Sequence, residues 1–194
     1  MIIQFKKKQS KFNDIIKMIA YKVLNEDDIN IKLFNGFIRH QVITKSWRKQ
    51  NDEWIIIDAP SVDDWSEEDY QFLVKCLKNT VSTGGFVYGA FNDIKLIGFV
   101  SVEPQTMGND EVYRELSSIH VSEDMRRKGI GKQLFLAAKE WALKSGADKL
   151  YISGHPSVES QAFYKKMGCV EAKISETSHV SREPFDCQLE CKLK

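Results

Sequence analysis

The chain has 194 residues, of which 42% are hydrophobic, and its 28 Lys and Arg against 27 Asp and Glu give a formal net charge of +1. This length suits one core better than two, so we expect a single domain over residues 1–194. A charge so near zero offers no overall field to nucleic acid or anionic lipid, and we expect neither partner. The N-terminal apolar run is too short for a signal peptide and no later run approaches the roughly 20 residues of a membrane span, which predicts a cytoplasmic protein.

The four cysteines are Cys76, Cys169, Cys187 and Cys191. They form no CxxC pair and have no His at the spacing of metal ligands, and four are too few for a disulfide framework in a chain of this length. We therefore expect reduced core thiols and no metal, with a zinc site as a remote alternative.

The first third of the chain predicts two helices with a hairpin between them. From Asn13, apolar residues recur at helical spacing over about three turns: Ile15, Ile16, Ile19, Ala20, Val23 and Leu24. Residues 37–47 and 54–58 are rich in β-branched and aromatic side chains and flank a segment that can turn, which indicates a hairpin. Ser66 and Asp69 resemble a capping box, and the residues after them line one face of a second helix: Tyr70, Leu73, Val74, Leu77 and Val81.

The rest of the chain alternates between strand and helix patterns. The pair Asn92-Asp93 tolerates the positive φ of a two-residue hairpin turn, and Gly146 ends a helical pattern. The predicted elements are strands at 86–91, 94–102 and 112–121, a helix at 132–145, a strand at 149–153, a helix at 157–167, and strands at 169–174 and 185–193. This order predicts a mixed sheet with helices packed on it.

The stretch from Val121 to Lys132 lies between a predicted strand and a predicted helix. Gly129 and Gly131 have no Cβ to keep an anion from the backbone, and the first N–H groups of the next helix carry partial positive charge. Its cationic side chains are Arg126, Arg127, Lys128 and Lys132. The stretch therefore fits a pyrophosphate.

Other phosphate-binding loops fit this stretch less well. A P-loop has Ser or Thr after its lysine, where this chain has Gln133, and a dinucleotide fingerprint has a third glycine, where this chain has Leu134. The alternative without a ligand is a basic turn whose glycines merely permit a tight connection.

The motif Arg126-x-x-Gly129-x-Gly131 resembles the pyrophosphate-binding motif of the GCN5-related N-acetyltransferases, the GNAT family. The segment 115–121 resembles the strand that leads into it. Segment 157–169 resembles the family's Asn-x-x-Ala-x-x-x-Tyr-x-x-x-Gly-Phe helix and exit, from which it departs at Ser157, Ser160 and Cys169. Residues 85–194 are the most family-like, whereas 1–84 contain the atypical hairpin and would shape the acceptor side.

The resemblance implies the acyl-CoA N-acyltransferase fold, an α/β fold of the mixed α+β kind with a central, mostly antiparallel mixed sheet flanked by helices. It implies acetyl-CoA as co-substrate and a primary amine, most simply of a small molecule, as acceptor. A protein or peptide acceptor and a catalytically silent CoA-binding sensor are the alternatives, and a homodimer is a further expectation. The implied cofactor-binding residues are Ile119, His120, Val121, Arg126, Arg127, Lys128, Gly129, Ile130, Gly131, Lys132, Ser157 and Tyr164.

Two catalytic roles follow from the same resemblance. Tyr164 stands where the family has the acid that protonates the departing thiolate, although a packing aromatic is the alternative. Glu115 stands where related enzymes relay the proton of the amine, and strand parity groups it with Ile119 only if no bulge intervenes. His120 and His155 are competing bases.

Eight acidic residues and no basic one lie between Asp52 and Asp69, interleaved with Trp54 and Trp65. Such a patch would attract a cationic amine. The alternative is that these carboxylates are solvated or favour the N-terminus of a helix.

Overall fold

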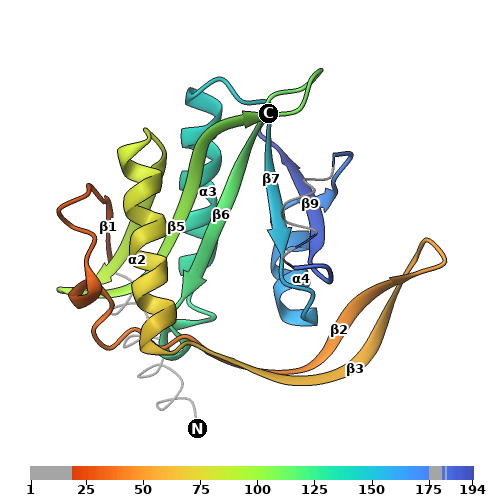
Figure 1. Cartoon of the computed structure of the whole chain (residues 1–194), viewed down its shortest axis with the longest axis horizontal. Coiled ribbons are helices and arrows are strands. Elements are labelled where there is room, and N and C mark those ends of the chain that lie inside the picture. The colour runs from red at the N-terminus through yellow and green to blue at the C-terminus, as the bar shows by residue number, and fades with distance from the viewer. Residues whose placement is uncertain (1–18, 175–180, 182) are drawn as a thin grey trace, which may run out of the picture.

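The computed structural model describes residues 19–174, 181 and 183–194. Within them, a seven-stranded sheet has the order β1-β4-β5-β6-β7-β9-β8 and is antiparallel except at the β6–β7 junction (Figure 1). The strands are β1 (Ile19–Val23), β4 (Phe86–Asn92), β5 (Lys95–Met107), β6 (Tyr113–Val121), β7 (Lys149–Gly154), β8 (Val170–Glu171) and β9 (Cys187–Lys192).

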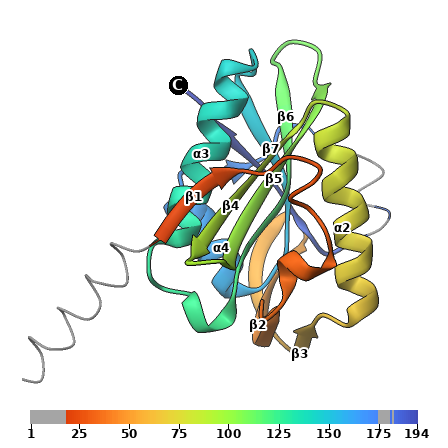
Figure 2. The same ribbon diagram turned by 90° about the vertical axis from the view of Figure 1, so that its left-hand side faces the viewer.

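Helices cover both faces of this sheet (Figure 2). Helix α2 (Glu67–Ser82) packs on one face around Leu77 and Phe99, whereas α3 (Ile130–Lys144) packs on the other around Leu134 and Phe135. Helix α4 (Val158–Lys166) lies on the α3 side, and two short 3-10 helices are η1 (Ile31–Phe34) and η2 (Glu123–Met125). The mixed α/β fold with a mostly antiparallel sheet is therefore confirmed.

The first predicted helix is wrong over its described part. Residues 19–23 form strand β1, which pairs with β4 from Ile19 opposite Asn92 to Val23 opposite Tyr88. Ile19 and Tyr21, two positions apart, both face the α3-side core, so the apolar residues here fit the two-residue period of a strand as well as helical spacing. Pairing with the edge strand β4 selects the strand. The predicted residues before Ile19 lie outside the described part of the chain.

The predicted hairpin is confirmed and is longer than expected. Strands β2 (His40–Gln50) and β3 (Glu53–Asp64) form a separate two-stranded sheet that sweeps from the foot of α2 across to α4 (Figure 1). At its far end the Trp47 N–H donates to the Pro156 carbonyl at 2.8 Å, and Lys49 pairs with Glu171 at 2.7 Å. The hairpin thus connects the start of α2 with the region around α4 and β8.

Most other local predictions hold, with small shifts of boundary. The Ser66–Asp69 capping box begins α2, and Asp93 has φ 54° in the β4–β5 turn. Helix α3 starts at Ile130 rather than at residue 132, and the strand predicted at 169–174 shortens to two residues.

Strands β6 and β7 separate after a short paired segment. Residues 113–115 pair with 149–151, and no further pairs join the two strands within the described chain. Beyond Glu115, the edge of β6 that faces β7 is not paired with that strand. The sheet is therefore closed at one end and open at the other.

Candidate active site

A cavity of about 520 Å³ opens where β6 and β7 separate. The hairpin and β6 form one wall, and β7, α4 and the segment before β9 form the other. It is lined by Arg39, Gln41, Asp63, Trp65, Leu116, Ser117, Ile119, His120, Val121, Arg126, Ser153, His155, Ser160, Tyr164, Glu183 and Asp186. Five of the predicted catalytic and cofactor-binding residues line it together, namely Ile119, His120, Val121, Arg126 and Tyr164. Glu115, Ser157 and the loop residues 127–132 are not among its lining residues.

The loop before α3 has the backbone shape that an anion site needs. Arg127 has φ 62°, and Gly129, the N-cap residue of α3, has φ 83°. A Cβ built on Gly129 would meet no heavy atom within 4 Å, so the backbone there is open, whereas one on Gly131 would lie 3.3 Å from the Phe163 ring. Because the first N–H groups of a helix lack intrahelical acceptors, this end of α3 fits a pyrophosphate.

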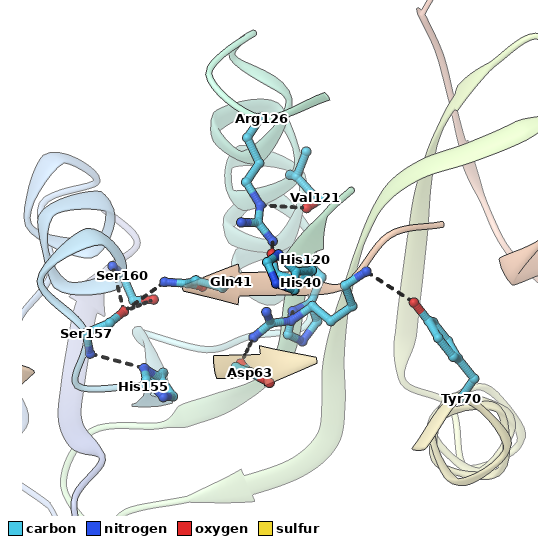
Figure 3. A network of polar contacts seen from close by, with 11 residues as sticks. His40, Gln41, Asp63, Tyr70, His120, Val121, Arg126, His155, Ser157 and Ser160 are labelled. Atoms are coloured by element: carbon cyan, nitrogen blue, oxygen red, sulfur yellow. Dashed lines mark hydrogen bonds and ion pairs between the residues drawn. The ribbon is translucent and has the colours of Figure 1, made fainter. Parts of the chain in front are cut away.

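Two of the loop cations are bound to the protein itself. Arg126 donates from Nη2 to the His40 carbonyl at 2.7 Å and from Nε to the Val121 carbonyl at 3.2 Å (Figure 3). Lys128 donates to the Asp124 carbonyl at 2.9 Å. Arg126 therefore ties the loop to the hairpin and lines the cavity instead of moving freely.

Tyr164 projects from α4 and is buried, with 8% of its surface exposed. Its ring packs closely against β7, since a Cβ on Gly154 would lie 3.0 Å from Cε2. Burial, with smaller effects of Cys169 and Asp186, raises the pKa of Tyr164 above its ordinary value. The phenol consequently stays protonated at neutral pH, which suits a proton donor.

Ser157 is fully buried and its hydroxyl is already engaged. The oxygen accepts from the Ser160 N–H at 3.3 Å and from Gln41 Nε2 at 3.3 Å, and it donates to the Ser160 hydroxyl at 2.9 Å (Figure 3). It caps α4 and anchors the hairpin. Of these two serines, only Ser160, in the first turn of α4, is among the lining residues of the cavity.

A bulge decides the orientation of Glu115. The register against β5 shifts between Leu116 and Ser118, so Ser117 is the extra residue. Leu116 lies in the α3-side core with Ile119 packed against it, and strand alternation therefore turns Glu115 and Ser117 toward the α2 face. The parity that would group Glu115 with Ile119 does not survive the bulge.

The two histidines considered as bases are both neutral side chains with an occupied Nδ1. His120 accepts from Arg39 Nε at 3.2 Å, and His155 accepts from the Ser157 N–H at 3.1 Å. Burial, helped by Arg39 and Arg126, lowers the pKa of His120 to about 3, and burial lowers the pKa of His155 as well. Neither ring is well suited to accept the proton of an amine at neutral pH.

The residues that sequence reasoning missed come mainly from the hairpin and its flanks. Arg39 forms an ion pair with Asp63 and lies 5.4 Å from the centroid of the Trp65 ring. Trp65 in turn meets the His120 ring edge-on at 4.7 Å. The sequence carried a partial signal, because Asp63 and Trp65 belong to the acidic, Trp-containing run.

Four other carboxylates of that acidic run have ordinary structural roles. Asp58 lies 3.5 Å from Lys45 on the exposed hairpin. The first turn of α2 holds Glu67, Glu68 and Asp69, where carboxylates favour the helix N-terminus. Only the part of the run next to α2 reaches the cavity.

No group of three or more His, Cys, Asp or Glu side chains among the described residues could hold a metal ion, and no helix in that part of the chain is long and apolar enough to cross a bilayer. The four cysteines form no disulfide; Cys169, Cys187 and Cys191 are buried as expected, whereas Cys76 is exposed and is not the core thiol that was predicted.

Comparison with known proteins adds to this geometry. Residues 43–169 match the model of the Acetyltransferase (GNAT) family. Over 115 residues, which are 56% of this chain and 70% of the relative, the sequence is 31% identical to the uncharacterized N-acetyltransferase YvbK of Bacillus subtilis (strain 168).

Solved structures share the fold. Nourseothricin acetyltransferase matches with a TM-score of 0.66 at 15% identity, covering 91% of this chain and 99% of its own. A Bacillus anthracis (strain Ames) protein described as a streptothricin acetyltransferase, solved with acetyl coenzyme A, matches with 0.62 at 17% identity over 89% and 95% of the two chains. PaiA N-acetyltransferase of Thermoplasma acidophilum, solved with coenzyme A, matches with 0.55 at 18% identity over 90% and 98%.

Proposed function

This chain belongs to the GNAT family of acetyltransferases and is an acetyl-CoA-dependent N-acetyltransferase, and we propose that it acetylates a primary amine of a small molecule by direct attack in a ternary complex. The observation that carries the proposal is the cavity at the separated ends of β6 and β7, with Tyr164 on one wall and the hairpin on the other.

The cofactor side of the cavity suits acetyl-CoA, which supplies a thioester carbonyl when bound. The backbone of residues 127–132 would hold the pyrophosphate at the N-terminus of α3, because Gly129 leaves that backbone open. The free edge of β6 at Ile119 and Val121 would pair with the pantetheine arm as an added strand does. The Val121 carbonyl already accepts from Arg126, so its N–H is the more available group there.

Bond changes in the proposed reaction are simple. The neutral amine forms a C–N bond to the acetyl carbon, the C–S bond breaks, and Tyr164 gives its proton to the leaving sulfur. Backbone N–H groups on the free edge of β6 are the donors nearest the developing negative oxygen. Glu115 takes the amine proton through a water molecule on the α2 face, beside Ser117, a residue of the cavity lining.

The hairpin favours a small acceptor over an extended peptide. Its docking on Pro156 and Glu171 encloses the acceptor side with a bridge anchored at both ends, where a peptide would need an open groove. Two structural neighbours are named for acetylating nourseothricin and streptothricin, which are names of small molecules.

A thiol-release assay tests the proposal. Purified protein with acetyl-CoA would be offered amino acids, polyamines, aminoglycosides and peptides, and the products would be identified by intact mass. We expect thiol release with at least one small amine and none with peptides. Acetylation of peptides alone would reassign the substrate class, and binding of acetyl-CoA in calorimetry without thiol release from any amine would favour a silent CoA-binding protein.

A further inference from the structure

The cavity has two walls of different charge. On the hairpin side its lining carries the guanidinium groups of Arg39 and Arg126 and one carboxylate, Asp63. On the Tyr164 side it carries the carboxylates of Glu183 and Asp186. Asp186 is near enough to Tyr164 to contribute to the raised pKa of that phenol. A ligand with separated charges of both signs matches this arrangement.

Arg39 is held rigidly by its surroundings. Its N–H donates to the Tyr70 hydroxyl at 3.2 Å, and its carbonyl accepts from the Trp65 N–H at 3.1 Å. Its side chain donates from Nε to His120, forms the ion pair with Asp63 and lies against Trp65. A guanidinium fixed in this way loses little conformational freedom when it binds an anion.

One end of this guanidinium lacks a partner. Arg39 is 8% exposed, and its Nη1 is buried without a hydrogen-bond partner among the described residues. Asp63 contacts Nη2 and His120 contacts Nε, so the third nitrogen is the one left over. A buried, unsatisfied donor is costly, and a ligand oxygen entering the cavity is the group that would satisfy it.

The neighbouring groups add donors and positive charge. Because His120 accepts at Nδ1, its neutral ring carries its proton on Nε2 and is a donor there. Arg126 is bonded to two carbonyl groups, so its charge is not cancelled by a direct carboxylate contact. Glu123, the other nearby carboxylate, does not line the cavity and lies 3.2 Å from His40.

We propose that the acceptor is a small zwitterion, a primary amine that also carries a carboxylate, and that Arg39 is the residue that selects the carboxylate. The amine end then faces Tyr164 and the acidic wall, where Asp186 and Glu183 favour a cationic group as it enters. A carboxylate fits better than a phosphate because the lining of the hairpin-side wall has one positive charge in excess. This inference rests on the proposed function.

The test uses acceptors that differ only in the charged group. A panel of L-amino acids, their carboxamides and the corresponding decarboxylated amines would be assayed with the wild-type protein, Arg39→Gln and the control Arg48→Gln. Arg48 lies on the same hairpin but outside the cavity lining, with its guanidinium 4.3 Å from the Phe185 ring centroid. We expect the wild type and the control to favour the acid over its carboxamide by about tenfold or more in kcat/KM.

Arg39→Gln should lose most of that preference, because the KM for the acid rises. The kcat/KM for the carboxamide should change less than about threefold, and the acetyl-CoA affinity measured by calorimetry should be unaltered. Wild-type protein that acetylates carboxamides or decarboxylated amines as well as acids overturns the inference and leaves the proposed function standing. Loss of acetyl-CoA affinity in Arg39→Gln would also overturn it, because Arg39 would then serve the cofactor. Even if the variant fails to fold, the wild-type ratio decides whether the acceptor is a zwitterion.

Discussion

Burial beside the cavity shifts the pKa values of Tyr164 and His120 in opposite directions. It raises the pKa of the phenol and lowers that of the imidazole to about 3, since in each case the charged form loses its hydration. Both side chains therefore carry the neutral form at physiological pH. For Tyr164 this form is a proton donor, and for His120 it is a ring whose Nδ1 is occupied by Arg39.

Tyr164→Phe should lower kcat by about 10²-fold, because the departing thiolate loses its proton donor. Acetyl-CoA affinity should change little, since the ring that packs on Gly154 remains. Thiol-release kinetics and calorimetry measure the two effects, and Tyr88→Phe, on β4 outside the cavity lining, is the control. A variant with wild-type kcat would move the acid role to another group.

Gly129→Val should weaken acetyl-CoA binding by about tenfold or more. The residue has φ 83°, which L side chains rarely adopt, and its Cβ would stand in open space at the end of α3 where the phosphate is expected. Calorimetry against Gly146→Val gives a matched comparison, because Gly146 has φ 84° and similar open space at the other end of α3. Equal affinity losses in both variants would mean that backbone strain alone is responsible.

At the scale of elements, the hairpin and the start of α2 together support one wall of the cavity, the proposed acceptor side. The hairpin contributes Asp63, and α2 begins just after Trp65, whose ring packs on Tyr70 and His120. The Tyr70 hydroxyl donates to the Phe37 carbonyl at 2.9 Å, which fixes the chain that leads into β2. The start of α2 is therefore both a helix terminus and a support for the cavity wall.

Ser66→Ala should cost about 1 kcal/mol of stability, since it removes the side chain that accepts from the Asp69 N–H at 3.2 Å. Thermal unfolding followed by circular dichroism measures the shift. Ser82→Ala, which removes a hydroxyl from the exposed end of the same helix, should change stability much less. Equal shifts for the two variants would argue against a capping contribution.

At the scale of the whole molecule, the sheet is held shut at the end opposite the cavity. Buried Lys149 on β7 donates to Glu190 on β9 at 2.8 Å and also pairs with Glu111. The Tyr113 hydroxyl on β6 donates to Glu190 at 2.8 Å. This network joins β6, β7 and β9 where they still pair, so that the separation of β6 from β7 is confined to the other end.

The network makes stability depend on pH. Although burial opposes it, hydrogen bonds from Lys149, the Lys173 N–H and Tyr113 hold the pKa of Glu190 below its ordinary value. Hydrogen bonds to Glu111 and Glu190 raise the pKa of Lys149. The contribution of Glu190 is thus present above the unfolded-state pKa of about 4.3 and is lost as pH falls through the lower folded value. That of Lys149 is present below about 10.4 and is lost only as pH rises through its higher folded value.

Glu190→Gln should therefore destabilise the protein by about 3 kcal/mol at pH 7, because a buried ammonium loses one of its carboxylate partners. The gap from wild type should begin to shrink as pH falls below the unfolded-state pKa of about 4.3, and it should close only below the lower folded pKa, where native Glu190 is protonated too. Urea unfolding at pH 7 and pH 3 measures both effects, with Glu140→Gln on the exposed face of α3 as the control. A gap of constant size at both pH values would contradict this account.

Short-range sequence patterns were sufficient to predict those structural features that depend only on neighbouring residues. The Ser66–Asp69 box, the turn at Asp93 and the glycine at the start of α3 depend on neighbours within a few residues, so they could be predicted. The proposed phosphate-binding loop and the proposed acid Tyr164 were likewise identified from spacing within single motifs, and their roles stay predictions. The order of the predicted strands and helices indicated the mixed fold, and the two linked motifs indicated the family.

The tertiary structure alone decided which of these residues meet. Residues 19–23 form a strand because the edge of β4 is there to pair with them, and Glu115 faces α2 because one extra residue at Ser117 reverses the alternation. Arg39 and His120 are 81 positions apart, and the hairpin brings them into contact. Such contacts depend on long-range packing and register, which local spacing does not encode, and they determine the hairpin-side wall of the cavity.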